Sequence, residues 1–132
     1  MRSFFIIPFK PTQWKEVKSD LRIDPLQYQT KMQQHWPESK IDFRPTDPHY
    51  LLWWELRRKN EFGLQGGLLQ DHQIVSFERN PKEEVLTEFV FWHRALIPGM
   101  YQLFISPENS WESLELKPGM TEYDVITFIR RF

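Results

Sequence analysis

The fold is decided by the stretch Tyr50-Leu51-Leu52-Trp53-Trp54-Glu55-Leu56-Arg57-Arg58-Lys59. Its apolar residues stand at successive positions, so a strand made from them has no polar side. Both faces of such a strand must be covered by other elements, or one face must serve as a contact surface. The neighbouring strand carries Gly66-Gly67, where two large indoles need room. The stretch therefore predicts the start of a three-strand antiparallel meander.

The meander is predicted over residues 50–58, 62–69 and 73–78. Its two-residue turns are expected at Asn60-Glu61 and Asp71-His72. These turns set a register with three expected cross-strand pairs: Trp54 with Gly67, Leu69 with Ile74, and Gly66 with Phe77.

This register divides the meander into two faces. The face expected to join the core collects Leu51, Trp53, Leu64, Leu68, Val75 and Phe77. The other face mixes polar groups with aromatic and aliphatic ones: Tyr50, Leu52, Trp54, Leu56, Gln65, Gly67, Leu69, Ile74, Ser76 and Glu78. We expect either that helices cover this mixed face, or that Tyr50 and Trp54 supply flat apolar area while Gln65 and Glu78 orient a ligand.

The other elements follow from periodicity and capping signals. A strand is predicted over 4–9, a helix from Pro11 with Trp14, Val17 and Leu21 on one side, and a short strand at 41–43. Asp24-Pro25 marks the start of a second helix, which ends before Pro37. Asn80-Pro81 marks the start of the main helix, which runs to Leu96.

The C-terminal part adds a hairpin and a helix. Strands are predicted over 101–106 and 111–116, and a terminal helix begins at a capping box formed by Thr121 and Asp124. The element order is β-α-α-β-β-β-α-β-β-α. It predicts one α+β domain over residues 1–132, with a mainly antiparallel sheet of five to six strands, a central three-strand meander and about four helices.

Composition excludes several classes of function. Of the 132 residues, 40% are hydrophobic and 16% aromatic, which is enough apolar area to form a core. The net charge of -1 argues against binding to duplex nucleic acid, and single-strand binding through stacked aromatics lacks a basic groove. The absence of cysteine removes thiol chemistry and disulfides. No signal peptide or membrane span is predicted, so the cytoplasm is the expected compartment.

No catalytic, cofactor or metal motif is recognised, and we assign no residue to these roles. The four histidines, at 35, 49, 72 and 93, lack the spacing of a zinc site. His93 is a candidate general base if a cleft opens beside it, and otherwise a histidine at the boundary of a core helix. The carboxylates show no informative spacing.

The order of elements resembles that of the GNAT acetyltransferases, which also run strand, two helices, three-strand meander and main helix. The resemblance implies binding of an acyl-CoA pyrophosphate at a glycine-rich loop that opens the main helix. Here that junction is Phe77-Glu78-Arg79-Asn80-Pro81-Lys82-Glu83, which contains no glycine, and the proline removes one amide donor. The resemblance covers topology and no motif.

These observations favour a non-enzymatic protein-interaction or regulatory module that binds a protein partner or self-associates as a homodimer. Trp111, beside a polar hairpin tip, is a further candidate for partner contact, or it folds back against the sheet. The rival interpretation is a small-molecule pocket or enzyme, in its most specific form an acyltransferase, with His93, Glu55 or Glu78 as the titratable group.

Overall fold

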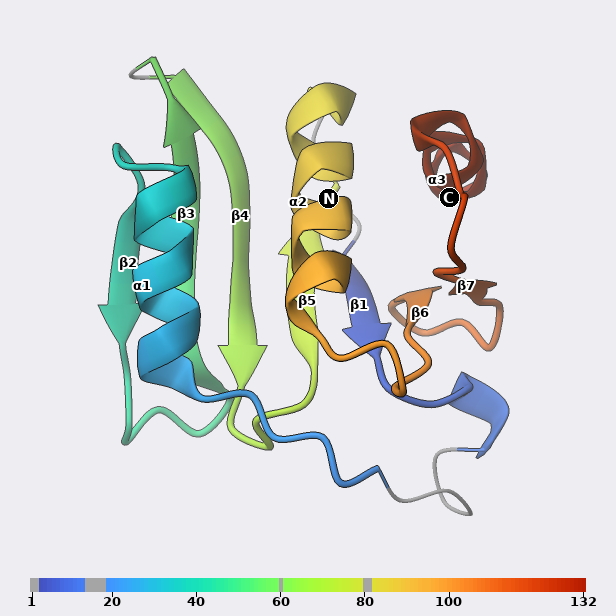
Figure 1. Ribbon diagram of the computed structural model, residues 1–132, viewed down its shortest axis with the longest axis horizontal. Helices are drawn as coiled ribbons and strands as arrows, with labels where there is room; N and C mark the ends of the chain where they lie inside the picture. The colour runs from blue at the N-terminus through green and yellow to red at the C-terminus, as the bar shows by residue number, and fades with distance from the viewer. Residues whose placement is uncertain (1–2, 14–18, 60, 80–81) are drawn as a thin grey trace.

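The computed structural model describes residues 3–13, 19–59, 61–79 and 82–132 of the chain. In these ranges the chain forms seven strands, three α-helices and a short 3-10 helix (Figure 1). Their order and bounds are β1 Ser3–Ile7, η1 Pro11–Gln13, α1 Pro25–His35, β2 Lys40–Phe43, β3 Tyr50–Arg58, β4 Glu61–Leu69, β5 Val75–Glu78, α2 Glu83–Leu96, β6 Phe104–Pro107, β7 Leu114–Glu115 and α3 Glu122–Arg130.

The strands form one sheet in the order β2-β3-β4-β5-β1-β6-β7, and every neighbouring pair is antiparallel. The α+β class and the meander β3-β4-β5 are therefore confirmed. The sheet has seven strands rather than five or six. The described residues contain three α-helices rather than about four, because Pro11–Gln13 forms only a 3-10 turn and residues 19–24 are not helical. Trp14 and Val17 of that predicted helix lie outside the described residues.

Local capping chemistry explains where two of the helices begin. The Asp24 carboxylate accepts a hydrogen bond from the Leu26 amide (3.0 Å), and Pro25 occupies the first turn of α1. Thr121 and Asp124 form the predicted capping box of α3. The predicted cap of α2 at Asn80-Pro81 lies outside the described residues, and the helix runs from Glu83 to Leu96.

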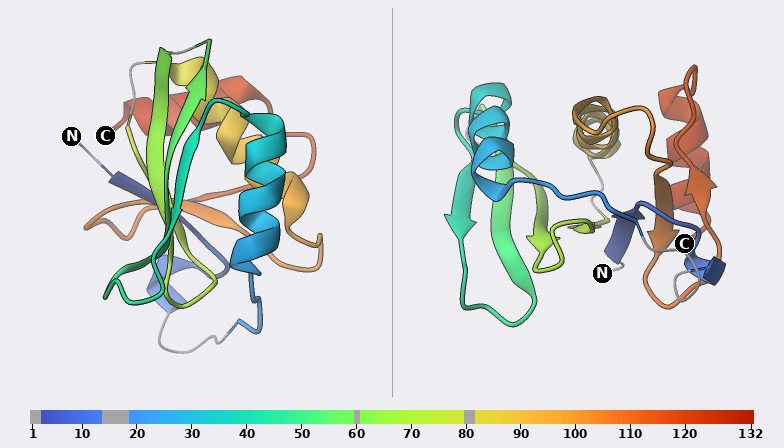
Figure 2. Two further views of the ribbon diagram at one scale, coloured as in Figure 1. Left: turned by 90° about the vertical axis from the view of Figure 1, so that its left-hand side faces the viewer. Right: turned by 60° about the horizontal axis from the view of Figure 1, so that its bottom comes forward.

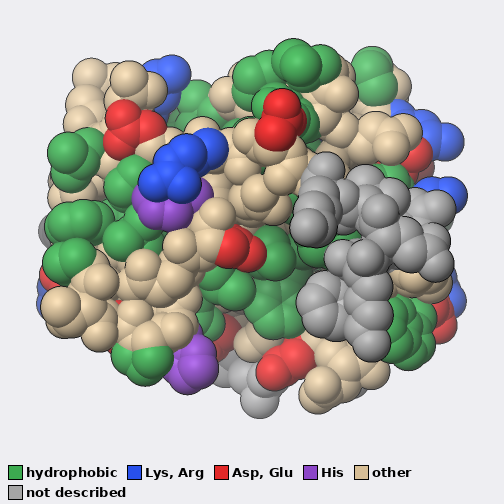
Figure 3. Space-filling model, turned by 90° about the horizontal axis from the view of Figure 1, so that it is seen from below, with side chains coloured by type: hydrophobic (Ala, Val, Ile, Leu, Met, Phe, Trp, Pro, Cys, Tyr) green, Lys and Arg blue, Asp and Glu red, His purple; other side chains and the backbone are tan. Residues whose placement is uncertain are grey.

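The three α-helices lie on one face of the sheet (Figure 2), where they enclose the hydrophobic core. Trp54, Leu56, Leu64, Leu68 and Phe77 face these helices and have no more than 1% of their surface exposed. None of the helices in the described part of the chain has the length and hydropathy of a membrane span. Seen from below, apolar side chains form several groups, one near the middle and others toward the left and the top of the view, with charged side chains between them (Figure 3).

The predicted register was correct for β4 and β5 and wrong for β3. Gly66 lies opposite Phe77, as predicted, and the Leu69 amide bonds to the Ile74 carbonyl (2.9 Å). Trp54, however, lies opposite Gly66, and Trp53 lies opposite Gly67. The hairpin closes earlier than predicted, at the pair Arg58 and Glu61, and the register shifts again between Leu56 and Arg57.

A slip of one residue moves every side chain of a strand to the opposite face. Leu52, Trp54 and Leu56 therefore join the core, although the sequence placed them on the mixed face. Trp53, which the sequence placed on the core face, instead lies half-buried on the face away from the helices.

Each glycine of the pair Gly66-Gly67 leaves space for one large aromatic ring, and the two rings lie on opposite faces of β4. A Cβ at Gly66 would meet the Ser76 carbonyl oxygen and would lie 2.9 Å from Nε1 of Trp54. A Cβ at Gly67 would lie 2.5 Å from Cδ1 of Tyr50. The glycines thus admit one indole and one phenol, not two indoles.

Candidate functional site

The face of the sheet opposite the three α-helices, here called the back face, carries the candidate site. Its side chains follow from the strand alternation and from the observed pairs. On the five central strands they are Ser3, Phe5 and Ile7 of β1, Tyr50, Trp53 and Glu55 of β3, Gln65, Gly67 and Leu69 of β4, Ser76 and Glu78 of β5, and Phe104 and Ser106 of β6. Most of them are uncharged, unlike the outer face of a fully solvated sheet.

A pocket of about 500 Å³ opens among these side chains. Its walls come from four places in the sequence: strand β1 with the segment after it, the β4–β5 turn, strand β6, and the loop between β6 and β7. The lining residues are Phe5, Ile7, Phe9, Pro11, Leu69, Ile74, Ser106, Pro107, Asn109, Ser110 and Trp111. None of them carries a charge, so the pocket is suited to an apolar, uncharged group.

The loop at the pocket rim is held in place by hydrogen bonds. The buried Ser106 hydroxyl lies within hydrogen-bond distance of the carbonyl oxygens of Ser110 (3.3 Å) and Glu112 (3.1 Å). The Ser110 amide donates to the Pro107 carbonyl (3.3 Å), and Asn109 adopts a left-handed conformation (φ 62°). Trp111 follows this turn and is 67% exposed, an unusual degree of exposure for a tryptophan. It does not fold back against the sheet.

The apolar surface extends from the pocket across the sheet. Leu69, a pocket residue, lies opposite Tyr50 in the β3–β4 pair. The Tyr50 ring crosses Gly67, its hydroxyl lies 3.2 Å from the Ser76 hydroxyl, and it meets the Trp53 ring edge-on at 5.1 Å. Four strand spacings separate β3 from β6, so the surface spans roughly 19 Å.

The structure separates the residues that the sequence proposed for binding. Tyr50, Gln65 and Glu78 share the back face, and each is half-buried. Trp111 lies at the pocket rim. The prediction that Trp54 contributes to binding on the mixed face was wrong. This residue is fully buried between the sheet and the helices, with its ring 5.7 Å from those of Tyr28 and Phe89.

The pocket itself, which includes Phe5, Ile7 and Ile74, was not predicted from the sequence. A signal was present, because Phe4-Phe5-Ile6-Ile7 is also apolar at successive positions. Like the central stretch, β1 therefore has no polar face of its own. The approach of residues 109–111 to β1 depends on the pairing of β1 with β6, which has no local signature.

His93 lies on the buried side of α2 rather than beside a cleft. It has no exposed surface, its Nδ1 lies 2.8 Å from the Tyr28 hydroxyl, and its Nε2 has no hydrogen-bond partner in the described part of the chain. Burial, assisted by the charge of Arg94, lowers its pKa from 6.5 to about 3. His93 is therefore neutral at pH 7 and has no contact with solvent through which to exchange a substrate proton.

The neutral His93 makes stability depend on pH. The folded state resists protonation down to about pH 3, whereas the unfolded chain takes up this proton near pH 6.5. Its contribution is therefore complete above pH 6.5 and is lost as the pH falls. We expect the free energy of unfolding to drop by about 2 kcal/mol between pH 7 and pH 5. Urea denaturation of the wild type and of His93→Gln at several pH values measures this loss. The prediction would be contradicted if the free energy of unfolding fell equally with pH in the two proteins.

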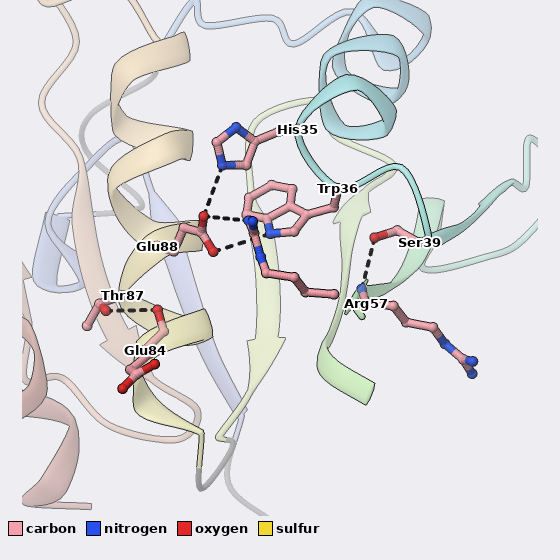
Figure 4. Close-up of polar contacts among 8 residues, drawn as sticks. His35, Trp36, Ser39, Arg57, Glu84, Thr87 and Glu88 are labelled. Carbon is pink, nitrogen blue, oxygen red and sulfur yellow. Dashed lines mark hydrogen bonds and ion pairs between the residues drawn. The ribbon is translucent and has the colours of Figure 1, made fainter. Parts of the chain in front are cut away.

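A second polar cluster fastens α1 to α2 and β3 (Figure 4). The Glu88 carboxylate accepts hydrogen bonds from Arg58 Nη2 (2.6 Å) and Trp36 Nε1 (3.4 Å), and His35 Nε2 lies 3.1 Å from it. Glu88 thus joins the end of α1 to the end of β3 across α2. The groups of this cluster satisfy one another's hydrogen bonds, which indicates a structural role.

The described residues contain no group of three or more His, Asp or Glu side chains that could hold a metal ion. The β5–α2 junction, where an acetyltransferase would hold a pyrophosphate, includes Asn80 and Pro81, which lie outside the described residues. The sequence predictions about metal, cofactor and acyl-CoA therefore stay predictions. No protein-family model matches the chain, and neither a curated protein nor a solved structure shows significant similarity to it.

Proposed function

We propose that this protein is a binding domain without catalytic activity of its own, and that apolar side chains of a protein partner occupy the back-face pocket. The observation that carries the proposal is the pocket of about 500 Å³ with no charged side chain in its lining. An exposed tryptophan, Trp111, stands at its rim. Interface hot spots combine such an aromatic anchor with a desolvated apolar centre.

The extent of the apolar surface favours a protein over a compact small molecule. The pocket continues through Leu69 to Tyr50 and Trp53, with Arg44 over the Trp53 ring at 5.6 Å. Glu55 and Arg57 form an ion pair (3.0 Å) farther along β3. An apolar centre with charged groups at its margin matches the anatomy of a protein interface.

Trp111 is the residue whose removal should affect binding with least effect on folding. A photo-crosslinking amino acid at position 111 is expected to capture a defined partner from an extract of the source cells. With that partner purified, Trp111→Ala should raise the dissociation constant by about 30-fold or more, because anchor residues contribute 2 kcal/mol or more. The melting temperature should change little, because the side chain is 67% exposed.

Tyr123 provides the matched control. It is an aromatic residue with 74% exposure on α3, and it does not line the pocket. A crosslinker at position 123 should capture no such partner, and Tyr123→Ala should bind as the wild type does. Equal capture at both positions, or unchanged affinity of Trp111→Ala, would contradict the proposal.

A small apolar molecule is the second candidate occupant, because the volume falls within the range of ligand pockets. It predicts that an organic extract of the purified protein contains a stoichiometric compound. Ile74→Trp, which narrows the pocket, should exclude that compound. These two results together would show that the occupant of the pocket is a small ligand and not a protein partner.

A further inference from the structure

Strand β2 forms one edge of the sheet and has only β3 as a neighbour (Figure 1). It is short, with Lys40, Asp42 and Phe43 exposed and Ile41 partly buried. An edge strand presents backbone donors and acceptors that can pair with another strand. Charged side chains on an edge strand ordinarily oppose such pairing. Whether a second strand can pair with β2 therefore depends on whether its charged side chains lie opposite like or opposite charges.

The backbone direction determines which residues of β2 are available. The Arg44 amide donates to the Leu51 carbonyl (2.7 Å), so Arg44, and with it Asp42 and Lys40, directs its backbone groups toward β3. Ile41 and Phe43 consequently direct their N–H and C=O groups outward. The strand is anchored at its start, because the Ser39 hydroxyl accepts a hydrogen bond from the Arg57 amide (2.9 Å; Figure 4).

We infer that two copies of this chain associate through β2, forming an antiparallel pair centred on Ile41. In this two-fold register the outward N–H and C=O groups of Ile41 bond to those of Ile41 in the second copy. Phe43 of each copy then lies opposite Ser39 of the other. Lys40 of each copy then lies opposite Asp42 of the other. Two opposite-charge pairs form on the back face, at non-hydrogen-bonded positions of the ladder, where cross-strand side chains approach most closely.

The adjacent register is disfavoured by the same charges. Sliding the second copy by two residues would place Asp42 opposite Asp42 and Lys40 opposite Arg44, so three like-charge contacts would replace the two attractive pairs. Within one copy, Lys40 lies opposite Glu55 and Asp42 lies 3.5 Å from Arg44. In the register centred on Ile41, by contrast, Lys40 would lie between two carboxylates, Glu55 of its own copy and Asp42 of the second copy.

The helix side of the junction is compatible with a second copy. Ile41 is partly buried against the core and would meet its equivalent across the axis, while Phe43, 46% exposed, would lose solvent contact. One side of α1 carries the uncharged side chains Gln29, Thr30, Gln33 and Gln34, while the exposed Lys31 lies on another side, near Leu96 at the end of α2. These amides can pair with each other without charge repulsion.

Two charge variants test this inference in the whole chain. Lys40→Asp gives a β2 strand with two acidic residues, and Asp42→Lys gives one with two basic residues. Sedimentation velocity up to about 1 mM protein covers the weak range expected of a small interface. The wild type should show concentration-dependent dimers, and each variant alone should dimerise at least fivefold more weakly.

Mixing the two variants should restore association, because both cross-axis pairs again join opposite charges. This recovery separates pairing at β2 from a general effect on folding, since neither variant regains stability by mixing. A monomeric wild type at about 1 mM, or a mixture no more associated than its components, would overturn the inference. The proposed partner site on the back-face pocket does not depend on this result.

Discussion

Replacing Trp54 with alanine is expected to lower the free energy of unfolding by about 3–5 kcal/mol, the cost of removing a large aromatic side chain from a packed core. Trp54 has no exposed surface and contacts the rings of Tyr28 and Phe89. Since small domains are stable by about 5–15 kcal/mol, this loss is a large fraction of the total. Urea denaturation followed by circular dichroism measures it.

Trp53 is the matched control for this variant, because the same residue type stands one position away. Trp53 is half-buried on the back face, beside Tyr50 and beneath Arg44. Trp53→Ala should therefore cost about 1–2 kcal/mol, well below the cost at Trp54. If Trp53→Ala proves the more destabilising of the two, the register of β3 is wrong.

Alanine at Gly66 is the second substitution with a large expected effect. Its Cβ would collide with the Ser76 carbonyl oxygen and would lie 2.9 Å from Trp54 Nε1. The first contact is to backbone, which cannot yield without disturbing the β4–β5 pair. We expect a loss of about 3 kcal/mol or more, the upper end of the range for overpacking a core.

Gly99 offers the comparison for Gly66. A Cβ at this position meets no atom within 4 Å, and Gly99 is not among the glycines with positive φ. Gly99→Ala should be neutral or slightly stabilising, because it restricts the unfolded chain without a clash. Equal unfolding midpoints for the two alanine variants would show that Gly66 is not tightly packed.

Local signals in the sequence were sufficient for most elements. The Asp24-Pro25 start, the Thr121 and Asp124 capping box and the end of α2 at Leu96 are confirmed, because each depends on neighbouring residues. Strands β6 and β7 are shorter than predicted, spanning Phe104–Pro107 and Leu114–Glu115. Their ends depend on pairing across the sheet, which local composition does not specify.

The register of β3 depended on a turn and a bulge that the sequence did not reveal. The turn was expected at Asn60-Glu61, but Lys59 adopts a positive φ of 55° and the hairpin closes at the pair Arg58 and Glu61. A strand that is apolar on both faces offers no alternation with which to detect the slip. The prediction therefore placed Trp54 on the wrong face while placing Gln65 and Ser76 correctly.

The candidate site was predictable only in part for a related reason. Tyr50, Gln65 and Glu78 were placed together because they belong to one local meander. The pocket joins Phe5, Ile74 and Trp111, which approach one another only because β1 pairs with both β5 and β6. Such long-range pairings are encoded in the whole packing arrangement rather than in any segment.

Our main inference is that the two faces of the sheet differ: helices close one face, and the other carries an open pocket. Hydroxyl-radical footprinting with mass spectrometry tests it directly by reading the solvent access of individual tryptophans. We expect fast oxidation of Trp111, slower oxidation of Trp53, and protection of Trp54 and Trp36, whose exposure is at most 1%. Oxidation of Trp54 at or above the rate of Trp53 would contradict it.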